Sequence, residues 1–174
     1  MIKNYLHYNY DKDIAVFLQS HSNKVLDAFF SLILYLTSIK ALVLYTIIFF
    51  IFYRDKTLKL LKLGIISLII NNILKNIIRR NRPYVSYSDI LGTYIDSGTG
   101  FSFPSGHAQL MATFLFYIYF STRLIFIKIC CLLALLAVCI SRMYFGLHFF
   151  TDILAGAFMG LCINLLFNKV TNNT

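Results

Sequence analysis

The sequence of 174 residues has few charged side chains, no tryptophan and only two prolines. Charged residues make up 13% of the chain and hydrophobic residues 59%, and the mean hydropathy is +0.72. Such a composition excludes an ordinary soluble domain and fits a small protein that crosses a membrane several times. No internal repeat or low-complexity segment stands out, so we expect one integral-membrane domain over residues 1–174.

The few cysteines exclude a disulfide framework or a cysteine metal site. All four lie inside apolar runs and have no metal-ligand partners at useful spacing. We interpret them as reduced residues that face the core or lipid. Residues 1–7 lack the long apolar core of a cleaved signal peptide, so we expect insertion to depend on internal spans. The four positions are Cys130, Cys131, Cys139 and Cys162.

Acidic residues are also scarce, with seven Asp and Glu against 16 Lys and Arg and a formal net charge of +9. In a soluble protein this excess would favour nucleic-acid binding. Here many cations flank apolar segments, so membrane topology and anionic lipids explain most of them. We expect the lipid bilayer and a lipid substrate as partners, with no nucleic acid and no obligate protein partner.

The apolar pattern predicts an all-α, polytopic membrane helix bundle with about five or six spans and an N-terminal interfacial helix. Within the interfacial segment 1–24, Ile14, Phe17 and Leu18 share a helical face and Asp11 lies elsewhere. Further along, apolar segments end near residues 53, 78, 121, 141 and 167.

Lys40 interrupts the first long apolar stretch, residues 25–53. A lysine at mid-bilayer costs about 2.5 to 3.5 kcal/mol, so we place Lys40 near an interface. The sequence leaves open whether the segment before it crosses the membrane. In the last span, Gly156 and Gly160 form a small-xxx-small step that predicts close helix packing.

Three blocks of polar residues interrupt the apolar chain, and the first contains Lys75 and Arg82. These cations are seven residues apart, so two helical turns bring them to one side, and Pro83 then ends the helix. The alternative is an ordinary basic flank that extends to the membrane interface. We interpret Arg79 and Arg80 in that way.

The second block is Pro104-Ser105-Gly106-His107, where a loop enters a helix. Free backbone amides at a helix start bind anions, and Gly106 permits close approach of the chain. Ser105 can cap the helix and donate to a phosphate. A plain helix start would explain the first three residues but gives no reason for His107.

The third block contains Ser141-Arg142, followed by His148 and Asp152. His148 and Asp152 are four residues apart and share a face if a helix begins near His148. A carboxylate on one imidazole nitrogen fixes the tautomer and makes the other nitrogen a better nucleophile. The alternative is a His–Asp pair that closes a helix end.

A zinc site formed by His107, His148 and Asp152 is another alternative. Three cations would converge on the same pocket, which argues against a further positive ion. We therefore expect no metal and no cofactor.

In order and spacing, the blocks resemble the signature of the type 2 phosphatidic acid phosphatase superfamily: Lys-x6-Arg-Pro, Pro-Ser-Gly-His and Ser-Arg-x5-His-x3-Asp. The resemblance covers residues 75–152 and fills every signature position. It implies that His148 attacks phosphorus to form a phosphohistidine, that Asp152 orients it, and that His107 protonates the leaving oxygen. It assigns substrate binding to five residues: Lys75, Arg82, Ser105, Gly106 and Arg142.

The resemblance implies a metal-independent lipid phosphate or pyrophosphate phosphatase but does not define its lipid. Undecaprenyl pyrophosphate, or several lipid phosphates, is the favoured substrate. Lipid A 1-phosphate, phosphatidylglycerophosphate and phosphoryl transfer to another lipid are the alternatives. A non-catalytic lipid-binding protein would leave the intact His148–Asp152 pair unexplained.

Alternate crossings predict that all three blocks meet at one membrane face. The opposite face receives a group of basic residues and is cytoplasmic by the positive-inside rule. Because the chain resembles compact bacterial members of the superfamily, we expect it in the inner membrane with its site on the periplasmic or extracellular side. The basic group is Arg54, Lys56, Lys59, Arg123 and Lys169.

Overall fold

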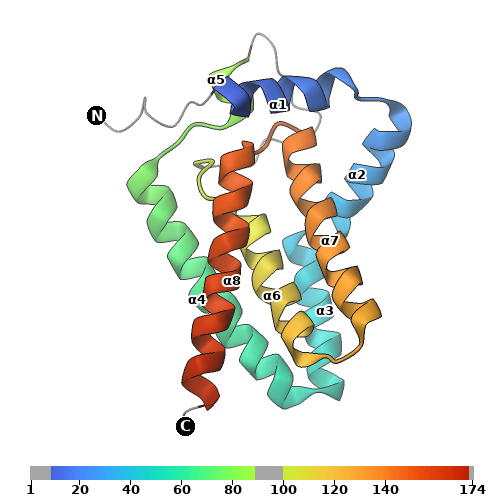
Figure 1. Cartoon of the computed structure of the whole chain (residues 1–174), viewed down its shortest axis with the longest axis vertical. Coiled ribbons are helices and arrows are strands. Elements are labelled where there is room, and N and C mark those ends of the chain that lie inside the picture. Colours follow the sequence, from blue (N-terminus) through green and yellow to red (C-terminus); the bar gives the residue numbers. More distant parts are fainter. Residues whose placement is uncertain (1–8, 89–99, 173–174) are drawn as a thin grey trace.

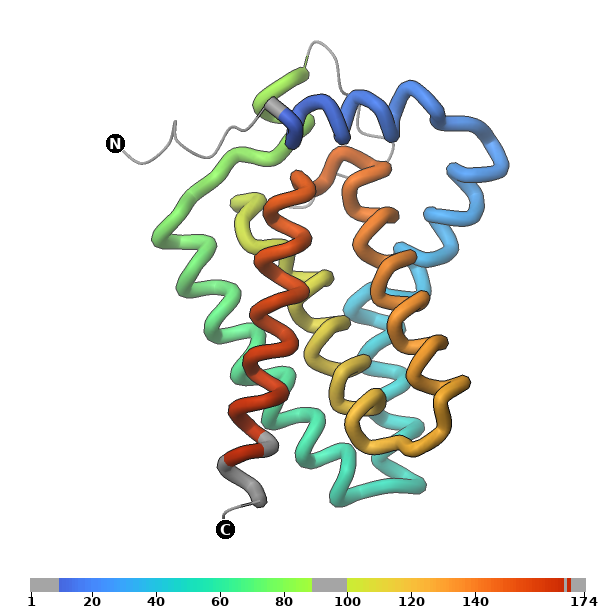
Figure 2. The backbone as a smooth tube through the Cα atoms, in the orientation of Figure 1, coloured from blue at the N-terminus to red at the C-terminus, as the bar shows by residue number. Residues whose placement is uncertain are grey.

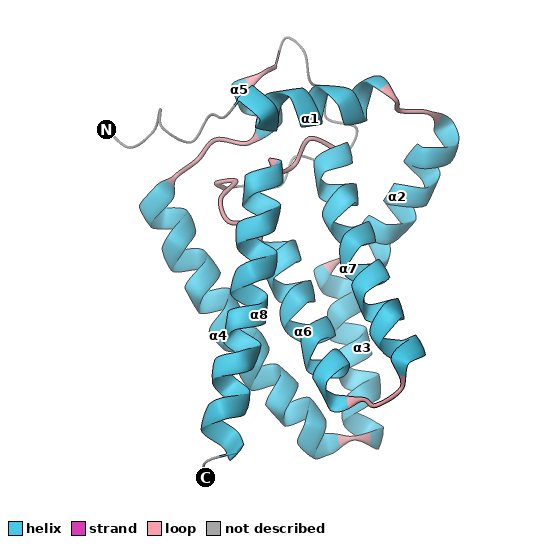
Figure 3. Ribbon diagram, in the orientation of Figure 1, coloured by secondary structure: helices cyan, strands magenta, loops and turns pink. Residues whose placement is uncertain are grey.

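A computed structural model describes residues 9–88 and 100–172, and this part of the chain is helical with no strand (Figures 1 and 3). The all-α prediction is confirmed. The helices are α1 (Asn9–Ser20), α2 (Lys24–Leu36), α3 (Ile39–Phe52), α4 (Arg54–Ile78), α5 (Pro83–Ser86), α6 (Gly106–Ser121), α7 (Ile125–Tyr144) and α8 (Phe150–Asn172).

Most helices run along the long axis of the molecule, while α1 lies across one end (Figure 1). At that end, called here the site end, α7 turns into α8 and the chain enters α6. The junctions α3–α4 and α6–α7 lie at the opposite end, called the far end, as the chain path shows (Figure 2). Helix α6 is central and packs most extensively against α8, then against α7 and α4.

Three described helical segments are long and apolar enough to cross a membrane: Arg54–Ser86, Ile125–Tyr144 and Phe150–Phe167. Helices α2 and α3, bent by 50° at their junction, meet the same test as a pair and give a fourth. Helix α6 has 16 residues, about 24 Å, and falls short of that length, although it runs between the same two ends. The described residues therefore contain three or four candidate spans where about five or six were expected, and α6 is a further, shorter helix of the bundle. Its outer surface carries many large apolar side chains, as a lipid-facing surface requires.

Local sequence determines where the helices end around the site. Gly146 adopts φ +65° after α7, and its N–H donates to Met143 O while the Leu147 N–H donates to Arg142 O. These two bonds form a Schellman motif, which stops α7 and brings His148 to the turn before α8. At the start of α6, the Ser105 hydroxyl caps the helix by accepting from Ala108 N at 3.4 Å.

Helix α1 is present, but its inward face differs from the predicted one. Ile14 and Leu18 pack against the core, whereas Phe17 is 60% exposed. Asp11, expected on the polar face, is buried with only 1% exposed. Positions 11, 14 and 18 follow the helical repeat, so Asp11 shares the inward face and the bundle supplies its partners.

The predicted close packing at Gly156 and Gly160 is present. An added Cβ at Gly156 would lie 2.6 Å from Ser105 O, and one at Gly160 would lie 2.5 Å from Gln109 O. Only glycine lets α8 approach the α6 backbone this closely. This contact fixes the start of α6 against the start of α8.

Candidate active site

A cavity of about 900 Å³ at the site end brings together residues from all three blocks. Arg82 precedes α5, His107 lies in the first turn of α6, Arg142 in the last turn of α7, and His148 in the turn before α8. Helices α2 and α3 form the opposite wall, with Leu34, Tyr35, Ser38, Ile39, Lys40, Ala41, Leu44 and Tyr45. Two histidines and two guanidinium groups therefore face one space whose other side is largely apolar.

His148 and Asp152 face each other with Ser102 between them. Their Nδ1 and Oδ2 atoms are 3.7 Å apart, too far for a direct hydrogen bond. Ser102 Oγ donates a short hydrogen bond to Asp152 Oδ2 and lies 3.4 Å from His148 Nδ1. The hydroxyl can relay the orienting effect of the carboxylate: Nδ1–H points to Ser102, and the Nε2 lone pair stays free.

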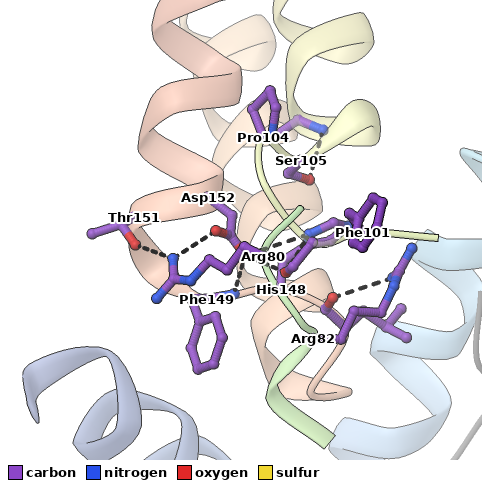
Figure 4. A network of polar contacts seen from close by, with 12 residues as sticks. Arg80, Arg82, Phe101, Pro104, Ser105, His148, Phe149, Thr151 and Asp152 are labelled. Atoms are coloured by element: carbon purple, nitrogen blue, oxygen red, sulfur yellow. Dashed lines mark hydrogen bonds and ion pairs between the residues drawn. The ribbon is translucent and has the colours of Figure 1, made fainter. Parts of the chain in front are cut away.

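Asp152 is fully buried and each of its oxygens is occupied (Figure 4). Oδ2 also accepts from the Phe149 N–H at 2.9 Å, which caps the first turn of α8. Oδ1 accepts from Arg80 Nη1 at 2.7 Å. The carboxylate is thus held in one orientation, with Oδ2 on the histidine side.

Burial, together with the nearby Arg82 and Lys75, lowers the pKa of His148 from 6.5 to about 4, against the opposing charge of Asp152. At neutral pH the imidazole is therefore uncharged. It gains a proton, and loses the lone pair a nucleophile needs, only as the pH falls towards 4.

The signature cations differ in position. Arg82 donates from Nε to Gly100 O at 3.1 Å and from Nη1 to Leu147 O at 3.2 Å, which holds it over the cavity. Arg142 donates from Nη2 to Thr37 Oγ1 at 2.9 Å, at the α2–α3 bend. Lys75 is not a lining residue, and its amine donates to the Phe101 carbonyl.

Residues 56–174, more than half of the sequence, match the PAP2 superfamily. The chain belongs to the PAP2 superfamily. Two solved structures share its fold at 24% identity. The transmembrane PAP2-type phosphatidylglycerolphosphate phosphatase of Bacillus subtilis has a TM-score of 0.80 and covers 97% of this chain and 89% of its own. LpxE of Aquifex aeolicus has a TM-score of 0.82, with 93% and 96% covered.

Two residues of the PAP2 signature make internal contacts rather than line the cavity. The Ser105 N–H donates to Asp152 O at 3.0 Å, which ties the start of α6 to α8. Gly106 faces Asn71, where a Cβ would lie 3.1 Å from Oδ1. Asn71 in turn donates to Pro104 O at 3.3 Å and to Gln109 Oε1 at 2.9 Å, so it braces the loop before α6.

Arg80 corrects the sequence interpretation, which treated it as an exposed basic flank of this PAP2 chain. It is 4% exposed and makes ion pairs with Asp152 at 2.7 Å and with Asp11 at 2.6 Å. Arg79 is exposed, as expected. The spacing in the first block did not separate the two arginines, because the partners of Arg80 lie 69 and 72 residues away.

Ser102 and Thr37 were not predicted as site residues. Neither lies in a signature block, and a lone serine or threonine carries no sequence signal of its contacts. In the described part of the chain, no group of three or more His, Cys, Asp or Glu side chains is placed to hold a metal ion.

Proposed function

We propose that this PAP2 protein hydrolyses a phosphate monoester or diphosphate on a membrane lipid through a phosphohistidine on His148. The observation that carries the proposal is the shared cavity: a buried, uncharged imidazole faces the same space as Arg82, Arg142 and His107. Fixed cations around a phosphoryl group stabilise the charge of its five-coordinate transition state, usually the largest catalytic contribution.

Arg142 lines the cavity together with both histidines, and its Nη2 bond to Thr37 Oγ1 holds the guanidinium in place. A guanidinium fixed in this way can donate to the oxygens of a phosphoryl group. Lys75 is not a lining residue, but it adds positive charge nearby and can leave the Phe101 carbonyl for the phosphate.

In the reaction, the Nε2 lone pair of His148 attacks phosphorus as the bond from phosphorus to the lipid-side oxygen breaks. That oxygen takes the bonding electron pair and a proton from His107, so the reaction requires this imidazole to be protonated when the phosphate is bound. Water then attacks the phosphohistidine and returns a proton to His107. Inorganic phosphate leaves, and His148 is again neutral.

The cavity wall supports a lipid substrate. Tyr35, Ile39 and Leu44 line the cavity and are 73%, 72% and 54% exposed. A head group at His148 therefore has an apolar path to the bilayer for its tail. Undecaprenyl pyrophosphate or several lipid phosphates fit this arrangement, as do lipid A 1-phosphate and phosphatidylglycerophosphate, the latter named for the Bacillus relative.

We place the protein in a bacterial inner membrane with the site end outside, because the far end carries the basic residues that flank the spans. Arg54 begins α4 and Arg123 lies between α6 and α7, both at that end. The site would then act on lipids of the outer leaflet.

The test is phosphate release by purified protein in detergent micelles from a panel of lipid mono- and diphosphates, with and without EDTA and vanadate. We expect turnover that survives EDTA, stops with vanadate, and leaves acid-labile label on the wild type but not on His148→Ala. No release from any lipid contradicts the proposal, as does activity that EDTA removes and zinc restores. Transfer of label to an added acceptor lipid, in preference to water, identifies a phosphotransferase instead.

A further inference from the structure

Arg80 connects a helix at the membrane surface to the buried carboxylate of the candidate site. It lies between α4 and α5, and its two terminal nitrogens point in different directions. Nη1 donates to Asp152 Oδ1 and to Thr151 Oγ1, both at 2.7 Å (Figure 4), and Nη2 donates to Asp11 Oδ2 at 2.6 Å. The guanidinium carbon also lies 4.0 Å from the centre of the Phe149 ring.

Asp11 contacts the start of α8 as well. Its Oδ1 accepts from Thr151 N at 3.1 Å, and its Oδ2 accepts from Thr151 Oγ1 at 2.6 Å. A side chain of α1 thus caps the first turn of the helix that carries Asp152, 141 positions later in the chain. Arg80, Asp11 and Thr151 form a closed set of contacts around Asp152.

The buried charges explain why Arg80 has to contact both carboxylates. Asp11 and Asp152 are 1% and 0% exposed, and two buried carboxylates without a cation between them would be strongly destabilising. One guanidinium binds both, but through different nitrogens, so Asp11 restrains Arg80 from turning wholly towards Asp152. Arg80 then holds Oδ1, which leaves Oδ2 directed at Ser102 and His148.

We infer that Asp11 and Arg80 are a pair of positioning residues: through Asp152 and Ser102 they hold the His148 imidazole in its attacking orientation. Helix α1 therefore contributes to the geometry of the site through Asp11. The inference rests on the proposed phosphohistidine reaction. Neither residue touches the substrate, so each acts on the turnover rate and not on phosphate binding.

The test compares Arg80→Gln, Arg80→Lys, Asp11→Asn and the double variant Asp11→Asn/Arg80→Gln in full-length protein. The matched controls are Arg79→Gln, one residue earlier and exposed, and Asp13→Asn, exposed on the same helix. The measurements are kcat and KM on a lipid phosphate, the inhibition constants for inorganic phosphate and vanadate, and the thermal unfolding temperature.

We expect Arg80→Gln to lower kcat by about 100-fold and Asp11→Asn by about 10-fold, since small displacements of a reacting group have effects of this size. KM and inhibition by inorganic phosphate should stay close to wild type, because Arg82 and Arg142 are untouched, whereas vanadate, which mimics the transition state at His148, should weaken together with kcat. The double variant should lose no more than Arg80→Gln alone, since the two residues act as a unit. Both controls should keep wild-type kcat.

Folded single variants with wild-type kcat overturn the inference, and so do additive losses in the double variant. A parallel loss of affinity for inorganic phosphate also overturns it, because it assigns the pair to the integrity of the fold. If Arg80→Gln does not fold, Asp11→Asn and Arg80→Lys decide the question. Asp11→Asn removes the charge of the side chain but keeps its size. Arg80→Lys keeps the positive charge but cannot bind two carboxylates through separate nitrogens of one guanidinium. A wild-type protein without phosphatase activity refutes the proposed function instead, which is a distinct result.

Discussion

At the residue scale, the two histidines have separable roles. His107 protonates the leaving oxygen in our proposal, which matters most when that oxygen leaves as a poor alkoxide. General acid catalysis contributes about 100- to 10,000-fold. His107→Ala should therefore be severely impaired on a lipid phosphate and much less so on a nitrophenyl phosphate, whose leaving group needs no proton.

His148→Ala is the control, because loss of the nucleophile should abolish turnover of both substrates. Labelled nitrophenyl phosphate should also let His107→Ala accumulate phosphoryl groups on His148. Equal impairment of His107→Ala on substrates with very different leaving-group pKa values would contradict the acid role and indicate plain phosphate binding.

Lys40 is the other informative single residue. It lines the cavity, is exposed, and makes no hydrogen bond or ion pair within the described residues. Lys40 is the third cation that lines the cavity, after Arg82 and Arg142, and it can bind the second phosphate of a diphosphate. We expect Lys40→Gln to lower kcat/KM about 10-fold on a lipid diphosphate, the effect of one charge-assisted hydrogen bond of about 1.5 kcal/mol, and to change a monophosphate little.

Lys56→Gln, at the far end, is the matched control and should be neutral on both lipids. Equal losses on mono- and diphosphate would show that Lys40 adds only general positive charge to the cavity.

The sequence predicted the histidines and arginines that line the cavity but not the residues that hold them in place. Sequence reasoning found three of them, His107, His148 and Arg142, because charged or polar side chains are costly in an apolar chain and usually mark a function. Asp11 and Ser102 act through contacts with residues far along the chain, and local patterns do not encode such contacts. Asp11 was assigned to the polar face of its helix for this reason.

At the element scale, the α6–α8 contact determines the geometry of the site, because these helices carry His107 and Asp152. Gly160→Ala would place a Cβ 2.5 Å from Gln109 O and 2.6 Å from Ala112 Cβ, and the α6 backbone cannot move away. We expect a loss of about 1 to 3 kcal/mol of stability, measured as a lower unfolding temperature in detergent.

The control is Gly64→Ala on α4, where the added Cβ would lie 3.3 Å from the Phe114 ring tip. That ring can shift, and alanine is a better helix former, so this variant should unfold near the wild-type temperature. A Gly160→Ala protein that is as stable as wild type would show that α8 can move away from α6.

Helices were well predicted where they are long and apolar, and less well where their direction changes. The α2–α3 bend lies part-way along the bundle (Figure 3), so Lys40 faces the cavity and not an end of the molecule. Thr37 at this bend accepts from Arg142 and donates to Ile33 O at 2.8 Å. Packing against a buried arginine therefore positions the bend, and apolar periodicity carries no information about it.

At the scale of the whole molecule, the bundle has two unlike ends. The site end holds a buried cluster of paired charges beneath α1, while the far end has short turns between α3 and α4 and between α6 and α7, with basic residues at them. Our proposal that the far end faces the cytoplasm rests on these basic residues. The orientation of the bundle decides which leaflet supplies the substrate.

Single cysteines introduced into a variant lacking the four native ones can test this orientation. Val85→Cys on α5 is 53% exposed at the site end, and Lys56→Cys and Thr122→Cys lie near the far-end turns. A membrane-impermeant thiol reagent should label Val85→Cys from outside intact cells, and the other two only after permeabilisation. The native set must be removed because Cys130 is exposed on α7 and would add background.

The reverse labelling pattern would place the cavity at the cytoplasmic face. It would leave the phosphatase chemistry intact, because no step depends on the side of the membrane, but it would exclude lipids of the outer leaflet as substrates. Labelling of all three sites from outside would instead indicate that the reagent crosses the membrane, and a second impermeant reagent of larger size resolves that case. The expected pattern, combined with turnover of a lipid diphosphate, would place dephosphorylation on the side from which polyprenyl carriers are recycled.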